Sequence, residues 1–254
     1  MSILSRQRIL FAVSLAAIAT AGLAPRIAQN PEYHLFADGN SYLSIPNALN
    51  VLTNLLFAWV GGEGLYRLLR QKSLHIMDQI RHVYSGFFAA LIMIAVGSIY
   101  YHWSPDNFSL ALDRLPIAIG FMSFFTIMLG ERISIALARR LYPVLIVAAI
   151  ASVAYWQYSE HLGQGDLRLY ALVVFAPILL TVLMLIMFPP RFTRTTDIWW
   201  VFTWYLVAKL CELFDHQIYN WLIVLSGHSL KHIAAGIACL VFLRHLRFRR
   251  ALES

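Results

Sequence analysis

The chain has 254 residues, of which 59% are hydrophobic and only 13% are charged, and its mean hydropathy is +0.65. A soluble domain has about 45–50% apolar residues, so this composition excludes an ordinary soluble protein and favours an all-α, polytopic membrane protein. The net charge of +7 predicts no nucleic-acid partner, because the cations lie in short clusters between apolar runs, as in membrane proteins.

Eight apolar runs are long enough to cross a bilayer, which takes roughly 17–25 residues in a helix. The runs are residues 8–24, 46–69, 82–102, 110–130, 141–158, 168–188, 197–214 and 221–243. The first could be a cleaved signal peptide, since Arg6 and Arg8 precede it and small residues follow it. We expect instead that residues 1–30 hold an uncleaved signal-anchor or extra transmembrane helix, and that residues 31–254 hold the other seven spans.

The loops between these runs are alternately rich and poor in cations. The cation-rich loops contain Arg67, Arg70, Lys72 and Arg81, then Arg132, Arg139 and Arg140, then Arg191 and Arg194, and the tail ends with Arg244, Arg247, Arg249 and Arg250. Cation-rich loops face the cytoplasm, which predicts eight spans with both termini inside. If the first run is cleaved, seven spans remain and the new N-terminus faces outside. The short loops suit a bacterial inner membrane.

Four ionisable groups from distant parts of the sequence are predicted to lie at the outer side of the membrane. His102 ends the third run, Asp113 begins the fourth, and His228 and His232 lie in the first turns of the last. A membrane helix tolerates such a group when it faces the bundle interior, pairs or binds something. A lone histidine is more often a packed residue, but three with a carboxylate favour a metal site. The imidazoles of His228 and His232 share one helix face because they are four residues apart.

These residues have the chemistry of a catalytic zinc site. Zinc accepts imidazole ligands, and three protein ligands leave a fourth position for water, whose pKa the metal lowers to about 7. Asp113 could then act as general base and afterwards as general acid. Ser98, one helical turn before His102, could donate to a developing oxyanion or hold Asp113. The site would lie toward the periplasm in the predicted topology.

Three stretches carry a resemblance to a known family. They are Gly97-Ser98-Ile99-Tyr100-Tyr101-His102, Leu112-Asp113-Arg114-Leu115-Pro116 and Gly227-His228-Ser229-Leu230-Lys231-His232. They resemble the alkaline ceramidases and the wider superfamily that includes the adiponectin and progestin receptors. The resemblance runs from about residue 33 to residue 245, and Asn50-Val51-Leu52-Thr53-Asn54 is similar to the family's first core helix.

The resemblance implies a fold, a cofactor and an activity. Residues 31–254 would form a seven-helix transmembrane bundle, preceded by an added helix. Zinc would be held by His102, His228 and His232, and Asp113 and Ser98 would be catalytic. The reaction would be zinc-dependent hydrolysis, within the membrane, of the amide bond of ceramide or a similar N-acyl lipid, which releases a fatty acid. The partner is therefore a membrane lipid substrate.

Calcium is a second cofactor that the resemblance raises. Animal alkaline ceramidases bind calcium through acidic residues just before the first core helix, where this chain has Asp38 and Asn40, with Asn47 in place of an expected glutamate. Asp, Gly and Asn also favour turns, so a calcium site and a plain turn both stay open here.

Two other functions remain as alternatives. One is a zinc-containing receptor or lipid sensor of the same superfamily without significant turnover. The other is a transporter that uses the histidines as a proton relay, although no internal repeat of the kind common in transporters is seen. A further polar cluster, Lys209, Glu212, Asp215 and His216, lies near the outer end of the seventh run. Lys209 and Glu212 are three residues apart and could pair. A structural tie between helices is the favoured interpretation, and a functional role, such as lining the substrate cavity, is the other.

Overall fold

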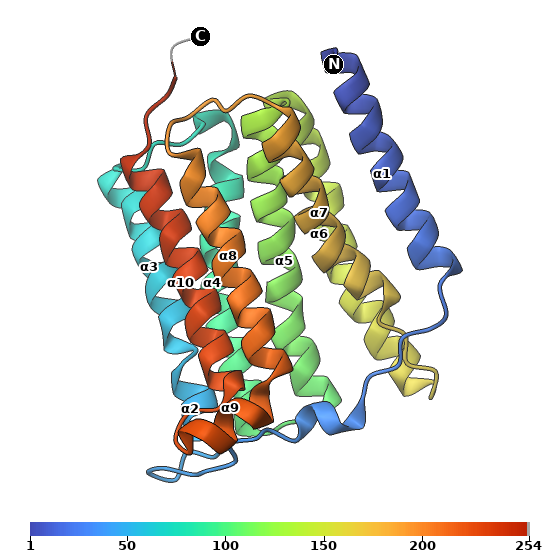
Figure 1. Cartoon of the computed structure of the whole chain (residues 1–254), viewed down its shortest axis with the longest axis vertical. Helices are drawn as coiled ribbons and strands as arrows, with labels where there is room; N and C mark the ends of the chain where they lie inside the picture. Colours follow the sequence, from blue (N-terminus) through green and yellow to red (C-terminus); the bar gives the residue numbers. More distant parts are fainter. Residues whose placement is uncertain (253–254) are drawn as a thin grey trace. The chain divides into compact units, whose positions relative to one another are not determined.

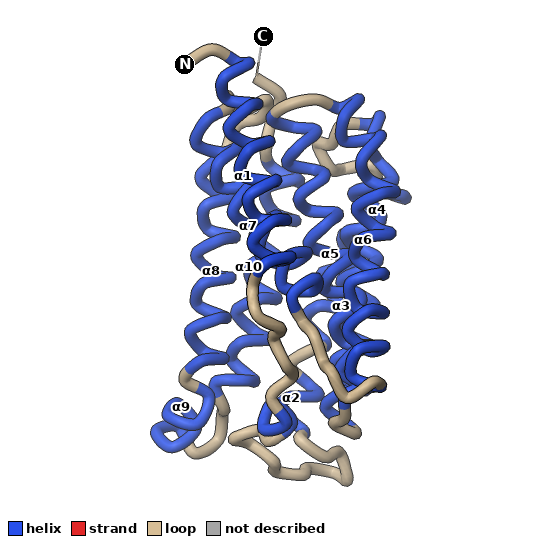
Figure 2. The backbone as a smooth tube through the Cα atoms, turned by 90° about the vertical axis from the view of Figure 1, so that its right-hand side faces the viewer, coloured by secondary structure: helices blue, strands red, loops and turns tan. Residues whose placement is uncertain are grey.

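The computed structural model describes residues 1–252, and within them the chain is helical with no β-strand (Figure 2). The α-helices are α1 (Ile3–Leu23), α2 (Ala48–Leu52), α3 (Leu55–Tyr66), α4 (Arg81–Trp103), α5 (Asn107–Arg132), α6 (Ile135–His161), α7 (Arg168–Met187), α8 (Thr195–Leu213), α9 (Asp215–Leu222) and α10 (Gly227–Phe248). Short 3-10 turns, η1 (Pro31–His34) and η3 (Asp78–Ile80), and a π-helical turn, η2 (Arg67–Gln71), complete the set. The all-helical prediction is confirmed.

Six helical segments in the described range are long and apolar enough to cross a membrane. They are α1, residues 78–103 (η3 with α4), α5, α6, α7 and α10. The run expected over residues 46–69 is divided between α2 and α3, and α8 carries Asp197, Lys209 and Glu212. The spanning helices support a membrane protein, whereas the count of eight spans stays a prediction.

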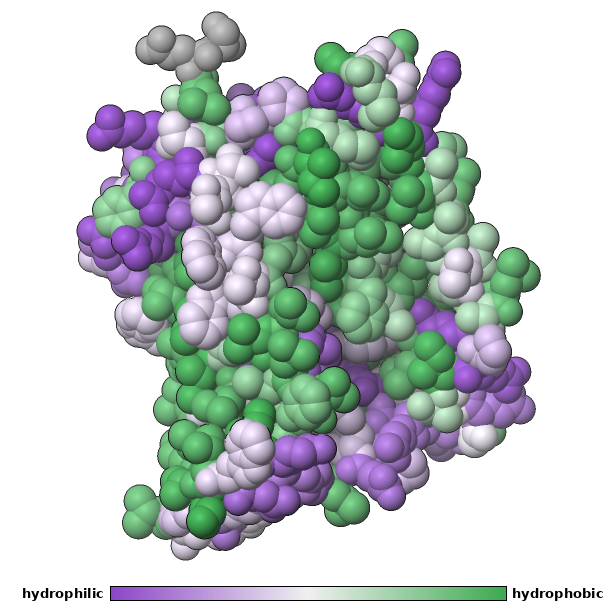
Figure 3. Space-filling view, viewed as in Figure 1, coloured by the Kyte–Doolittle hydropathy of each residue, from purple (hydrophilic) through white to green (hydrophobic). Residues whose placement is uncertain are grey.

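Large apolar side chains are exposed on these helices. Phe11, Val144 and Ile186 expose 66%, 61% and 67% of their surface, and much of the surface visible in the space-filling view is apolar (Figure 3). A soluble protein seldom exposes large continuous apolar patches, and a bilayer would cover this surface with acyl chains. The helical backbone satisfies its own hydrogen bonds, as a membrane interior requires.

The chain divides into two compact units. The first comprises Met1–Gln29, Met77–Phe87 and Ile117–Arg191, and the second comprises Asn30–Ile76, Phe88–Pro116 and the chain from Phe192 onward. In the first unit α7 packs against both α1 and α6. The backbone N–H of Leu167 donates to the carbonyl of Ile27 at 2.8 Å, which joins the segment after α1 to the start of α7.

In the second unit α10 lies between α8 and α3 and packs against both (Figure 1). The contact with α3 is close at Gly236, where an added Cβ would lie 2.4 Å from Cδ2 of Leu56. The short helices α2 and α9 lie at the same end of this unit in both views (Figures 1 and 2). This is also the end where α10 begins and α4 ends, so polar residues from distant parts of the sequence meet there.

A glycine brings α4 and α5 together at this end. A Cβ on Gly97 would lie 2.3 Å from the carbonyl oxygen of Leu112 and 3.2 Å from Cα of Asp113. The two helices therefore meet where Ser98 and Asp113 lie.

The start of α5 is fixed by Asp106, whose Oδ1 accepts the N–H of Ser109 at 2.6 Å. That hydrogen bond lowers the pKa of Asp106, as expected for an acid at a helix N-terminus.

Candidate metal centre

Three buried imidazoles converge in the second unit. His102 is at the end of α4, and His228 and His232 lie in the first two turns of α10. The ring centroids are 4.9 Å apart for His102 and His228, 4.9 Å for His102 and His232, and 5.0 Å for His228 and His232. One ligand nitrogen from each ring lies within 4.8 Å of the others. The predicted convergence is therefore present, and the group could hold a metal ion.

The hydrogen bonding of these rings fits a metal. Both ring nitrogens of His102 and Nε2 of His228 are buried without a hydrogen-bond partner, and the three residues expose only 1%, 5% and 5% of their surface. Buried polar atoms are nearly always paired, because an unpaired one costs free energy. Unpaired nitrogens on rings that face one another are the donor set that zinc accepts.

The N-terminus of α10 is held in place by two side chains. Ser226 caps the helix, since its Oγ accepts the N–H of Ser229 at 3.1 Å. Asp215, at the start of α9, accepts the N–H of His228 on Oδ1 at 2.7 Å. These bonds satisfy N–H groups that a helix leaves unpaired in its first turn. The same contacts fix the turn that carries His228.

The predicted catalytic pair is also brought together. The Ser98 side chain interacts with the carboxylate of Asp113, while Oδ1 of Asp113 is buried and has no hydrogen-bond partner. Ser98 lies four residues before His102, so the two share a face of α4. The Ser98–Asp113 pair therefore lies one helical turn from a candidate metal ligand, with one carboxylate oxygen free to accept a proton.

Phe36, from the loop before α2, packs on the histidine cluster. Its ring centroid lies 4.7 Å from that of His102 and 4.9 Å from that of His228, in edge-to-face geometry. The next residue is tied down, because the N–H of Ala37 donates to Oδ2 of Asp215 at 3.2 Å. Asp215 thus joins the Phe36 segment to the turn that carries His228, a role that the sequence did not reveal.

The polar cluster at the end of α8 forms a network that includes Lys231. Glu212 pairs with Lys209, as predicted, and its Oε1 accepts from Nζ of Lys231 at 2.9 Å and from the hydroxyl of Tyr33 at 3.2 Å. Burial, followed by the charge of Glu212, raises the pKa of Tyr33, so the phenol stays protonated and donates. His216 is exposed. The network links α8 to α10 beside the histidines.

The residues considered for calcium make bonds of their own. Oδ1 of Asp38 accepts the N–H of Asn40 at 3.0 Å, and Oδ2 is buried without a hydrogen-bond partner. The amide of Asn40 donates to the Tyr219 hydroxyl at 2.8 Å, and that of Asn47 donates to the carbonyl of His102 at 2.8 Å. Asn47 therefore satisfies a carbonyl at the C-terminal end of α4. Calcium binding stays a prediction.

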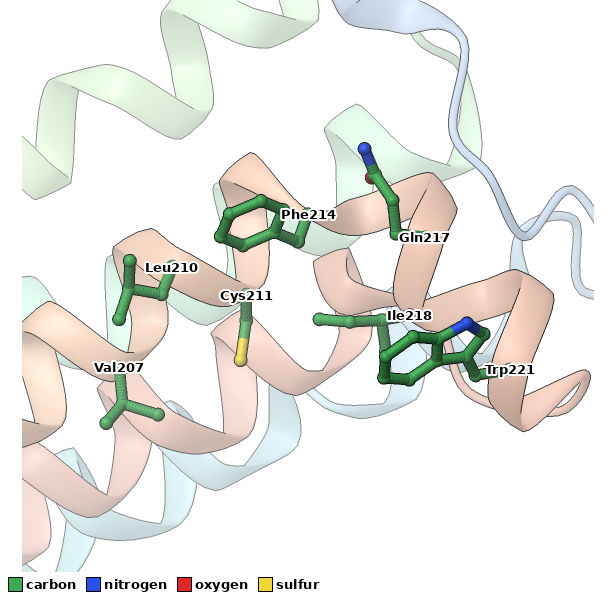
Figure 4. A pocket seen from close by; sticks show the side chains of 7 residues that line it. All are labelled: Val207, Leu210, Cys211, Phe214, Gln217, Ile218 and Trp221. Atoms are coloured by element: carbon green, nitrogen blue, oxygen red, sulfur yellow. The ribbon is translucent and has the colours of Figure 1, made fainter.

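An apolar groove of about 480 Å³ lies between α8 and α9 (Figure 4). It is lined by Val207, Leu210, Cys211, Phe214, Gln217, Ile218 and Trp221. Its volume is within the range of ligand pockets, roughly 300–1,000 Å³. None of the predicted site residues lines it, so it offers apolar contact surface and not the chemistry of the histidine cluster.

Sequence reasoning missed Phe36 and Lys231 as neighbours of the cluster. Lys231 could have been found, because it lies between two candidate ligands on α10. Phe36 comes from a loop whose path nothing in the local sequence defines.

Comparisons of the chain with protein-family models, with curated proteins and with solved structures gave no match.

Proposed function

We propose that the protein is a zinc-dependent hydrolase that cleaves, within the membrane, the amide bond of ceramide or a similar N-acyl lipid. One observation carries the proposal: three buried imidazoles, with unpaired nitrogens on His102 and His228, face one another one helical turn from the Ser98–Asp113 pair. The resemblance of the motifs around these residues to the alkaline ceramidases gives the reaction class.

His102, His228 and His232 would hold the zinc. When bound there, zinc supplies a Lewis acid that polarises a carbonyl and lowers the pKa of a coordinated water. Asp113 would take a proton from the attacking water on its unpaired Oδ1 and deliver it to the leaving amine. Ser98, which interacts with this carboxylate, would keep it oriented. The burial of the three histidines keeps bulk water from the rings, which strengthens electrostatic interactions within the site.

We further propose eight spans in a bacterial inner membrane, with the histidine cluster toward the periplasm. The alternation of cation-rich and cation-poor loops supports this topology. His102, His228 and His232 lie at helix ends that the alternation assigns to the outer side. The substrate would enter laterally from the bilayer, because a lipid amide resides near the headgroup level.

The test is hydrolysis of N-acyl lipids by the purified protein, with fatty acid as the measured product. The wild type should contain stoichiometric zinc and release fatty acid, and chelation should abolish the release. His102→Ala and Asp113→Ala should be inactive although both insert into the membrane. His216→Ala is the matched control, because His216 is exposed and should retain full activity.

Two outcomes would overturn the proposal. Full activity in both His102→Ala and Asp113→Ala would remove these residues from the reaction. Stoichiometric zinc without release of fatty acid from any lipid amide would favour the receptor or sensor of the same superfamily.

A further inference from the structure

The polar residues Asn50, Thr53 and Asn54 turn toward α10, and the proposed reaction does not use them. Asn50 and Asn54 are fully buried, and Thr53 is half-buried. Oδ1 of Asn50 accepts the hydroxyl of Ser229 at 2.7 Å, which ties α2 to the first turn of α10. Three residues further along, Oγ1 of Thr53 lies 3.0 Å from Nδ1 of His232.

The direction of the Thr53–His232 bond follows from the hydrogens available. A threonine hydroxyl has one hydrogen and two lone pairs. That hydrogen is directed to the carbonyl oxygen of Leu49, 2.7 Å from Oγ1, with the carbonyl of Asn50 as a longer alternative at 3.4 Å. With its hydrogen used there, Oγ1 can only accept from His232. Nδ1 of the imidazole must then carry the proton.

We propose that Thr53 is a positioning residue that holds His232 in the tautomer protonated at Nδ1, so that the lone pair of Nε2 faces the metal. The inference rests on the proposed function only in requiring a metal at the three histidines. Metal-bound histidines commonly donate their other N–H to a neighbouring oxygen, which fixes the ring and its tautomer.

The amide of Asn54 is the one competing donor near this ring. Its Nδ2 lies 3.3 Å from Nδ1 of His232 and donates one of its two hydrogens to the carbonyl of Asn50 at 2.7 Å. The contact with Oγ1 of Thr53 is shorter, at 3.0 Å, and that oxygen has no hydrogen left to donate, so we assign the proton to Nδ1.

The same bonds explain why the helix is interrupted here. The side chains of Thr53 and Asn54 bond to carbonyls four residues back, at Leu49 and Asn50. Such bonds compete with the regular helix and bend it. Helix α2 accordingly ends at Leu52, and α3 begins at Leu55. The interruption within an apolar run is therefore the place where the chain supports a metal ligand.

The test is zinc affinity, measured by competition with a chromophoric chelator on the full-length protein. Thr53→Val keeps the shape of the side chain and removes the acceptor, so it should weaken zinc binding by about 10–100-fold, the usual effect of losing such a partner. Thr53→Ser keeps the hydroxyl and should bind zinc as the wild type does. Equal affinity of Thr53→Val and wild type would overturn the inference, as would a serine variant as weak as the valine variant.

A second measurement on the wild type holds even if Thr53→Val fails to fold. A crystal structure of the zinc-loaded protein should show zinc on Nε2 of His232 and Oγ1 of Thr53 on Nδ1; zinc on Nδ1 would overturn the inference. If zinc binding depends on Thr53 but the protein hydrolyses no lipid amide, the inference stands and the proposed function fails. If the protein hydrolyses lipid amides and zinc affinity does not depend on Thr53, the inference alone fails.

Discussion

His102 and His228 would be costly to bury without a ligand. His102 exposes 1% of its surface and has no partner on either ring nitrogen, and a buried polar group that loses its hydrogen bond costs about 1–3 kcal/mol. The ring nitrogens of His102 face the other two imidazoles, and each neutral imidazole has only one N–H to donate. A divalent cation replaces these unmade bonds with coordination, so we expect the metal to stabilise the fold as well as to serve the chemistry.

Asp113→Asn should separate catalysis from metal binding. The amide retains the size of the carboxylate and can still bond to Ser98, but it cannot take a proton from water. We expect stoichiometric zinc and a fall in kcat of roughly 10²–10⁴-fold, the usual contribution of a general base. Turnover and zinc content are measured on the same preparation. Asp78→Asn, on an exposed residue of the first unit, is the control, and an unchanged kcat in Asp113→Asn would assign the proton transfer to another group.

At the level of elements, the site depends on how closely helices approach one another. Gly97 lets α4 and α5 meet beside Ser98, and Gly227 lets α10 start against α8, since a Cβ there would lie 2.2 Å from the carbonyl oxygen of Cys211. The sequence predicted the helices that carry His102, Asp113 and His228 because their apolar runs are long. It could not predict the division of residues 46–69 into α2 and α3, which depends on side chains that bond to α10.

Gly97→Ala should destabilise the protein and impair turnover together. The added methyl would force α4 and α5 apart next to Asp113, and overpacking of this kind costs about 1–3 kcal/mol. We expect a lower unfolding midpoint in detergent and a reduced kcat. Gly62→Ala is the matched control: it lies within α3 with nothing within 4 Å of an added Cβ, so its higher helix propensity should leave the midpoint equal or raised. Equal behaviour of the two variants would contradict the close approach at Gly97.

At the scale of the whole molecule, the predicted site residues and the histidine cluster fall within one of the two units. Ser98, His102, Asp113, His228 and His232 all belong to the second unit, whereas α1 belongs to the first. The sequence predicted that the histidines would meet, because loop charges assigned their helix ends to one side of the membrane. It did not predict the ties made by Asp215 or Thr53, since such contacts depend on tertiary packing and leave no periodic pattern.

The tie between α1 and α7 should depend on pH through Asp166. Its carboxylate accepts from Nη2 of Arg168 at 2.8 Å, and Nη1 of the same arginine donates to the carbonyl of Ala24 at 2.7 Å. The hydrogen bonds from Arg168 lower the pKa of Asp166 from 3.8 to about 2. Because the pKa is lowered in the folded protein, the ionised carboxylate contributes stability above its ordinary pKa, and that contribution is lost as the pH falls from 3.8 toward 2.

Asp166→Asn should therefore lower the unfolding midpoint by a few degrees at pH 7 and by the same amount at pH 5. The difference from the wild type should shrink at pH 3 and continue to shrink toward pH 2, as the wild-type carboxylate becomes protonated. Thermal unfolding in detergent across this range measures the effect. Zinc affinity at pH 7 should be unchanged, because the ligands belong to the second unit. A midpoint unaffected at pH 7 would show that the Asp166–Arg168 pair does not stabilise the protein, and weakened zinc binding would show that the histidine cluster depends on the first unit.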